Sequence, residues 1–161
     1  MTEKKTIIVI YIFSLLGILA WLGAILLAPY FKSQSIPESR LLYGVFSRIC
    51  HQAPSRCFYL FGFPLAVCTR CLGIYLGFLS GIVFFPFIKG FKMAAVPPSW
   101  LFIFLTFPIA VDTGGNFLSL WSSPDWLRFV FGLIWGSILP FYFVVGLSDF
   151  FTHLQKKKKR V

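Results

Sequence analysis

Charge is scarce in this sequence. Only 12% of its 161 residues are charged, against about 25% in ordinary soluble proteins, while 58% are hydrophobic and the mean hydropathy is +0.82. A water-soluble domain of this length cannot bury that much apolar surface. The composition therefore excludes a soluble globular protein and predicts an all-α membrane protein, because helices satisfy their own backbone hydrogen bonds in lipid.

The sequence also lacks the features and motifs that are typical of several classes of protein. No linker, internal repeat or low-complexity tract other than a basic tail separates a second domain, so residues 1–161 are expected to form one transmembrane domain. No phosphate-binding loop, catalytic triad or paired-carboxylate site is present, which leaves open whether the protein is an enzyme. The net charge of +10 has no aromatic and basic surface module beside it, which excludes nucleic-acid binding.

Charge-poor segments predict about four membrane-spanning helices. A span needs roughly 20 apolar residues to cross about 30 Å of hydrocarbon. The predicted spans cover residues 7–29, 65–88, 93–111 and 129–148. Pro64 is expected to lie in the first turn of the second span, and Asp112 is expected to end the third. The apolar run 41–49 is too short to span and predicts a short loop helix at the outer face.

The distribution of Lys and Arg predicts the orientation. Four spans place both termini on one side of the membrane, together with nine of the 15 basic residues. The positive-inside rule then predicts a multi-pass protein of the inner (cell) membrane with both termini in the cytoplasm. The tail, residues 154–161, serves as a topology signal and also suits contact with anionic lipid. Its basic residues are Lys156, Lys157, Lys158, Lys159 and Arg160. Nothing in the sequence sets the oligomeric state.

Glycines recur every four residues in two of the predicted spans. They are Gly73, Gly77 and Gly81 in the second span, and Gly132 and Gly136 in the fourth. Small residues at this spacing let helix backbones approach closely in lipid. We therefore expect these two helices to contact each other along their glycine faces, which would bring Asp125 and Arg128 near the cysteines described next.

All four cysteines lie in one short stretch at the predicted outer face. Cys50 is followed directly by His51, and Cys68 lies three residues before Cys71. Residues three apart share a face of a helix, so Cys68 and Cys71 present both sulfurs to one point that Cys50 and His51 can approach from the loop. Three thiolates and an imidazole suit zinc, and soft sulfur ligands also suit iron or copper(I). The predicted metal site is Cys50, His51, Cys68 and Cys71, with zinc or iron as its ion.

The same cysteines allow two other interpretations. In an oxidising compartment four cysteines can form two disulfides, and a helix start beside Arg70 favours thiolate at Cys68 and Cys71. This architecture resembles the quinone-linked disulfide-forming oxidases of bacteria, a class of membrane thiol-disulfide oxidoreductase. Those proteins keep a second cysteine pair in the other outer loop, where this chain has none. The third interpretation is a structural scaffold without chemistry.

Arginines accompany the cysteines on the side where the charge rule disfavours them. Arg48, Arg56 and Arg70 are expected to stabilise thiolates or to hold an anion such as a phosphate, a lipid head group or Asp112. An unpaired carboxylate at the membrane edge, such as that of Asp112, carries a high desolvation cost. An ion pair of Asp112 with Arg70 or Arg48 is therefore predicted. The run 112–116 also allows a tight turn whose backbone amides could bind an anion.

Two motifs resemble a known family. Cys-His-Gln-Ala-Pro-Ser-Arg at 50–56 and Cys-Thr-Arg-Cys-Leu-Gly-Ile-Tyr at 68–75 resemble the signature of a family of small predicted membrane proteins catalogued as a domain of unknown function. The resemblance covers roughly residues 40–146 and leaves the first helix outside. The family usually has serine in place of Cys57 and a different sequence after Asp112. The resemblance thus implies that Cys57 is dispensable, and the odd number of remaining cysteines favours a metal site over two disulfides.

Overall fold

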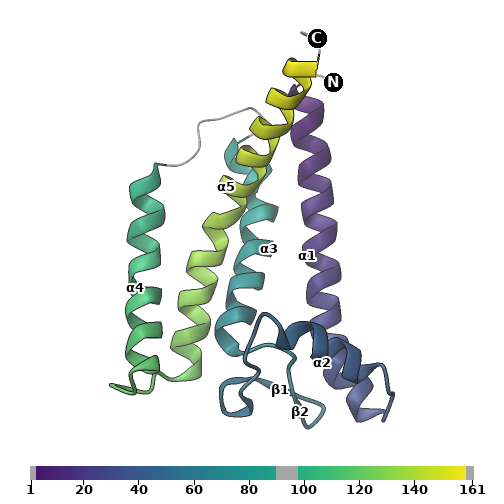
Figure 1. Ribbon diagram of the computed structural model, residues 1–161, viewed down its shortest axis with the longest axis vertical. Coiled ribbons are helices and arrows are strands. Elements are labelled where there is room, and N and C mark those ends of the chain that lie inside the picture. The colour runs from purple at the N-terminus through teal and green to yellow at the C-terminus, as the bar shows by residue number, and fades with distance from the viewer. Residues whose placement is uncertain (1–2, 90–97, 159–161) are drawn as a thin grey trace.

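The protein is a bundle of long helices. The computed structural model describes residues 3–89 and 98–158, and within them four helices are long and apolar enough to cross a membrane (Figure 1). These helices are α1 (Glu3–Ser33), α3 (Thr69–Lys89), α4 (Ser99–Phe117) and α5 (Asp125–Lys158). The predicted all-α membrane bundle is confirmed, and its lipid-facing surface contacts the bilayer.

A compact segment connects α1 to α3. It contains the short helix α2 (Ser39–Ser47), a 3-10 turn η1 (Pro54–Arg56) and the antiparallel strands β1 (Tyr59–Leu60) and β2 (Phe63–Pro64). Phe61 and Gly62 form the hairpin turn with φ values of 53° and 80°, as the twist of a two-residue hairpin requires. On α2, Phe46 is buried while Leu41 and Val45 are exposed. The predicted loop helix is therefore present and has an apolar outer face.

Helices α3 and α5 form the closest contact of the bundle. Gly73, Gly77 and Gly81 face the backbone of α5, and an added Cβ at Gly77 would overlap the carbonyl oxygen of Leu133. In return, Gly132 faces the carbonyl oxygen of Arg70, and Gly136 faces that of Ile74. The predicted glycine contact is confirmed, because only hydrogen side chains allow the two backbones to approach this closely.

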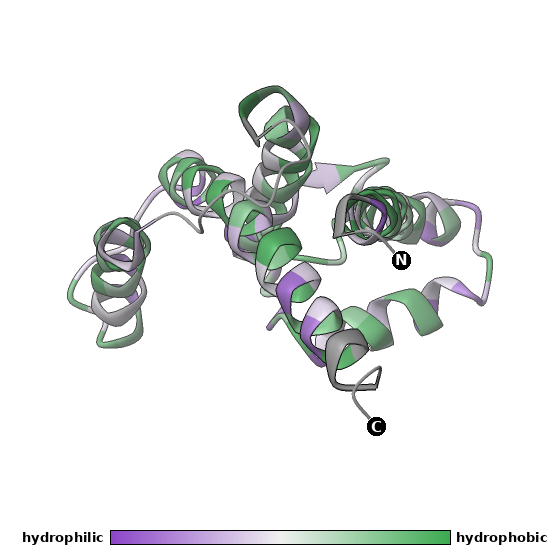
Figure 2. Cartoon of the chain, turned by 90° about the horizontal axis from the view of Figure 1, so that it is seen from above, coloured by the Kyte–Doolittle hydropathy of each residue, from purple (hydrophilic) through white to green (hydrophobic). Residues whose placement is uncertain are grey.

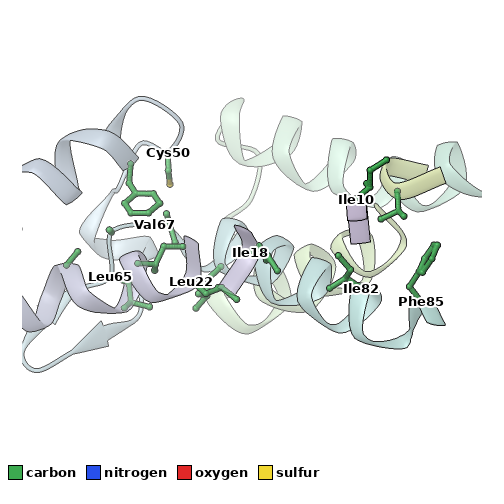
Figure 3. Packing of buried hydrophobic residues seen from close by; sticks show 14 of the residues in the cluster. Ile10, Ile18, Leu22, Cys50, Leu65, Val67, Ile82 and Phe85 are labelled. Atoms are coloured by element: carbon green, nitrogen blue, oxygen red, sulfur yellow. The ribbon is translucent and has the colours of Figure 1, made fainter. Parts of the chain in front are cut away.

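The apolar core lies between α1, α3 and α5. Ile10, Ile18 and Leu22 of α1 pack with Ile82 and Phe85 of α3 in one cluster (Figure 3). Helix α4 lies at the side of the bundle and packs mainly on α5 (Figure 2). Hydrophobic residues surround the long helices in the same view, as expected where lipid is the solvent.

The two ends of the bundle differ. The start of α1 and the end of α5 lie at one end, and α2 with the β1–β2 hairpin lies at the other (Figure 1). We call the end that carries α2 and the hairpin the outer end. The arrangement agrees with an even number of crossings, which places the termini on the same side of the membrane.

Three local expectations were wrong. Helix α3 begins at Thr69, so residues 65–68 are not helical and Pro64 lies in β2, where its carbonyl accepts a hydrogen bond from Tyr43 at 2.5 Å. Helix α4 continues to Phe117, so Asp112 lies inside it and residues 112–116 are helical rather than a tight turn. The helix can include Asp112 because an ion pair neutralises the carboxylate, as described below. Residues 93–97 of the predicted third span lie outside the described part of the chain.

The glycine contact generates a prediction. Gly77→Leu should lower the melting temperature in detergent by about 10 °C, because overpacking against a backbone costs up to about 3 kcal/mol. Gly146→Leu is the matched control, since an added Cβ at this position of α5 meets no atom within 4 Å. Scanning fluorimetry of both purified proteins measures the difference, and equal melting temperatures would contradict the contact.

Candidate metal centre

Three cysteine sulfurs converge at the outer end of the bundle. The Sγ atoms of Cys50, Cys68 and Cys71 all lie within 4.8 Å of one another. Cys71 lies in the first turn of α3, Cys68 directly precedes that helix, and Cys50 follows α2. The helical spacing thus brings two sulfurs together, and the fold of the connecting segment brings the third.

Backbone hydrogen bonds hold Cys50 against the start of α3. The amide of Cys50 donates to the carbonyl oxygen of Phe46 at 2.9 Å, so the end of α2 fixes its position. The amide of Cys68 donates to Cys50 Sγ at 3.2 Å. This bond places a donor on the sulfur itself, as is common where a thiolate must be stabilised.

The side chain of Gln52 connects two parts of the segment between α1 and α3. Gln52 was not among the site residues predicted from the sequence. Its side-chain amide donates to the carbonyl oxygens of Tyr43 at 2.9 Å and Ala66 at 2.7 Å, which joins α2 to the loop between β2 and α3. Its own backbone has a φ of 49°, in the left-handed region. The only signal in the sequence was its place directly after the Cys-His pair.

The cluster lies at the boundary of the apolar core. Cys50 is 6% exposed, and Cys68 and Cys71 are half-buried. Figure 3 shows Cys50 near Val67 and Leu65 at one end of the core. Hydrogen bonds from the thiols of Cys68 and then Cys71 lower the pKa of Cys50, and the hydrogen bond to Cys50 raises the pKa of Cys68. Of these two thiols, Cys50 is therefore the one that ionises more readily.

The fourth predicted ligand, His51, and the fourth cysteine, Cys57, are not part of this cluster. His51 is exposed and does not belong to the group of ligand atoms within 4.8 Å. Cys57 is 5% exposed, and its thiol donates to the carbonyl oxygen of Ala53 at 3.2 Å. Burial raises the pKa of Cys57 to about 12, so it remains a neutral thiol. This behaviour agrees with its expected dispensability.

Arg70 forms the predicted ion pair with Asp112. Asp112 is 5% exposed and also accepts hydrogen bonds from Ser123 and from Asn116, the latter at 3.1 Å. The structure selects Arg70, in the first turn of α3, as the partner. Arg48 and Arg56 are exposed and form no ion pair with the described residues.

A chain of polar contacts connects this ion pair to α5. Asn116 Oδ1 accepts from Arg128 Nη2 at 2.7 Å, and Arg128 Nη1 donates to Asp125 at 3.3 Å. Asp125 in turn accepts from the hydroxyl of Thr69, which lies between Cys68 and Cys71 in the sequence, at 3.4 Å. We call these residues the polar network: Thr69, Arg70, Asp112, Asn116, Ser123, Asp125 and Arg128. Asn116, one turn after Asp112, was detectable by spacing, whereas Ser123 had no sequence signal.

The fold and the cysteine cluster define a multi-pass helical membrane protein with three thiols gathered at one membrane boundary. The chain belongs to the family described as predicted membrane protein (DUF2085), whose profile matches residues 50–142. The match begins at Cys50 and includes all three clustered cysteines and the polar network, while α1 lies outside it.

Two archaeal relatives are similar to the chain. An uncharacterized protein of Methanocaldococcus jannaschii is 39% identical over 155 residues, which cover 92% of this chain and 97% of the relative. An uncharacterized protein of Methanothermobacter thermautotrophicus is 34% identical over 88 residues, covering 55% of this chain and 78% of the relative. No solved structure matches the chain significantly.

The ion pair generates a prediction. Asp112→Ala should destabilise the protein by about 3 kcal/mol or more, because it leaves the largely buried charge of Arg70 without a partner. Arg56→Ala, an exposed position, should change stability by less than about 0.5 kcal/mol. Denaturation of both variants in the same detergent measures the difference. Equal stability would show that the polar network does not hold α3 to α4.

Proposed function

We propose that the protein binds a metal ion through Cys50, Cys68 and Cys71 at the extracytoplasmic face of the membrane. The observation that supports this function is the convergence of three sulfurs within 4.8 Å. A tetrahedral zinc ion with bonds of about 2.3 Å holds its sulfurs about 3.8 Å apart. The sulfurs therefore need to move by no more than about 1 Å to bind.

Electrostatics also favour a cation. Three thiolates at the edge of an apolar core repel one another, and burial penalises each charge unless a positive partner compensates it. The nearest guanidinium group on the same turn, Arg70, is already paired with Asp112. A metal ion would supply the missing positive charge and would replace the protons that the cysteines otherwise share.

Zinc or iron is the proposed ion, with a fourth position beside the three sulfurs. His51 is the protein ligand proposed for it, because it directly follows Cys50, although its imidazole must turn inward from an exposed position. If an external ligand takes the fourth position, the site has the open coordination that is typical of reactive metal centres. The exposed Arg48 and Arg56 lie beside this segment and could attract an anionic ligand.

A redox function is the second candidate. Half-buried cysteines three residues apart, with Cys50 as a favoured thiolate, also suit thiol–disulfide exchange. Such a function requires sulfur pairs that cycle between thiol and disulfide, whereas a metal site requires all three sulfurs to stay reduced. A scaffold would require neither, so metal content and thiol number separate the three functions.

Metal analysis provides the test. Protein purified without chelator should contain about one zinc or iron ion per chain and four free thiols after denaturation. Cys68→Ala should lose the metal, while Cys57→Ala, the matched control, should retain it because Cys57 is not part of the cluster. Elemental analysis with a thiol count measures both quantities.

Other outcomes have clear meanings. A metal-free protein with two fewer thiols would favour the redox function, and a metal-free protein with four thiols would favour a scaffold. Retention of metal in His51→Ala would assign the fourth position to an external ligand, whereas its loss would identify His51 as a ligand.

The protein is further proposed to lie in the inner (cell) membrane with both termini in the cytoplasm. Green fluorescent protein fused to the C-terminus should fluoresce, and alkaline phosphatase at the same place should be inactive, because the positive-inside rule retains the lysine-rich tail. Active phosphatase would show that the orientation is the opposite one.

The tail is also proposed to contact anionic lipid, and its residues 159–161 lie outside the described part of the chain.

A further inference from the structure

Helix α2 lies across the direction of the long helices at the outer end of the bundle (Figure 1 and Figure 2). Its inner face packs on α1, where the buried ring of Phe46 contacts Trp21 at 4.9 Å between centroids. The hydroxyl of Tyr43, on the same side of α2, donates to the carbonyl oxygen of Pro64 in the hairpin. These contacts fix which side of α2 faces the protein and which side faces away from it.

The outward side of α2 is divided lengthwise into an apolar part and a polar part. Leu41 and Val45, with Ile49 in the turn that follows the helix, recur every four residues and are 71%, 53% and 51% exposed. Arg40 and Ser47 are exposed on the other flank, because residues seven apart share a face of a helix. We call Leu41, Val45 and Ile49 the apolar stripe. A helix that lies in the plane of the lipid–water interface has this division of its surface.

Exposed aromatic side chains mark the outer end as a membrane boundary. Tyr30, near the end of α1, and Phe61, at the tip of the hairpin, are both exposed, and their rings lie 5.7 Å apart between centroids. Tyr59 of β1 is exposed as well. Tyrosine collects at the lipid–water interface, where its ring contacts lipid and its hydroxyl contacts water. Helix α2 lies at the same end of the bundle as these rings (Figure 1), so its apolar stripe lies within reach of lipid.

Two cations accompany the apolar stripe. Arg40 and Arg48 are exposed, and neither forms an ion pair with a residue of the described ranges 3–89 and 98–158. Helix α2 contains no Asp or Glu, and Glu38 precedes it. Guanidinium groups match the geometry of phosphate oxygens, so this surface is complementary to an anionic lipid surface. A second copy of the chain would bring the same positive charges together, which disfavours a dimer through this face.

We propose that α2 is an interfacial anchor that binds anionic phospholipids of the leaflet at the outer end. The apolar stripe enters the boundary of the acyl chains, and Arg40 and Arg48 bind the lipid phosphates. The end of α2 also positions the cysteine cluster, because the carbonyl oxygen of Phe46 accepts from the amide of Cys50 at 2.9 Å. Lipid that holds α2 therefore steadies the segment that presents Cys50. The proposal goes beyond the metal function and does not depend on it.

Lipid titration followed by native mass spectrometry tests the charge contact. The full chain in a neutral detergent should bind phosphatidylglycerol more tightly than phosphatidylcholine. Arg40→Gln combined with Arg48→Gln should weaken phosphatidylglycerol binding by about tenfold, because each basic side chain at an anionic surface adds to the attraction. Arg40→Lys combined with Arg48→Lys keeps both charges and should retain most of the affinity.

Two controls accompany this titration. Arg56→Gln is the matched variant, since Arg56 is an exposed arginine of the same connecting segment but lies outside α2, and the affinity should stay within about twofold of wild type. The titration is repeated on the full chain with the basic tail residues 156–160 changed to glutamine, so that lipid bound to the tail does not hide the effect.

Photo-crosslinking tests the apolar contact. The chain with p-benzoylphenylalanine in place of Val45, held in nanodiscs of phosphatidylcholine and phosphatidylglycerol, should gain the mass of one phospholipid on irradiation. The matched control carries the same amino acid in place of Ser47, which is exposed on the polar flank of the same helix and should form much less adduct. Cys68→Ala should bind phosphatidylglycerol as wild type, even if it loses metal, because the apolar stripe and both arginines lie outside the cysteine cluster.

Four results would overturn the proposal. The first is equal phosphatidylglycerol affinity of the double glutamine variant and Arg56→Gln. The second is equal adduct yield at positions 45 and 47, or an adduct at position 45 with a second copy of the chain in place of lipid. The third is competition by glycerol 3-phosphate as effective as that by phosphatidylglycerol, which would mean that the arginines bind a soluble phosphate. The fourth is loss of lipid binding in Cys68→Ala, which would make lipid binding a property of the metal centre.

Discussion

The close approach of α3 and α5 is the contact on which the rest of the structure depends. In lipid, two helices gain little from apolar side chains alone, so a backbone contact through glycine is a main source of their association. Gly132 lies against the carbonyl oxygen of Arg70, and Gly136 lies against Ile74. These contacts flank Cys71 along α3. The same packing that joins the helices therefore fixes the turn that presents two of the three clustered sulfurs.

The polar network extends this constraint to α4 and to the outer end of α5. Asp112 accepts from Arg70 of α3 and from Ser123 in the loop before α5, while Thr69 donates to Asp125 of α5. The charged side chains of the polar network form ion pairs with one another, which offsets part of their desolvation cost. The network leaves the sulfurs without a guanidinium partner of their own, which is why a cation at the cluster is chemically reasonable.

An aromatic contact between α1 and α2 supports the cysteine cluster. Phe46 contacts Trp21 with its ring and holds Cys50 with its carbonyl oxygen. The packing of α1 against α2 therefore contributes to the position of Cys50.

Composition and periodicity alone determined the membrane class, the spanning helices, the α3–α5 glycine contact and the pairing of Cys68 with Cys71, because hydropathy and helical spacing are local properties of the chain. The sequence could not decide that Cys50 joins them while its neighbour His51 stays exposed. That outcome depends on the path of residues 50–68, which is set by hydrogen bonds from Gln52 and Tyr43 to distant carbonyl groups. Likewise, only the tertiary structure placed Ser123 on Asp112 and Arg128 on Asn116, since contacts between different elements follow from how the helices and loops pack.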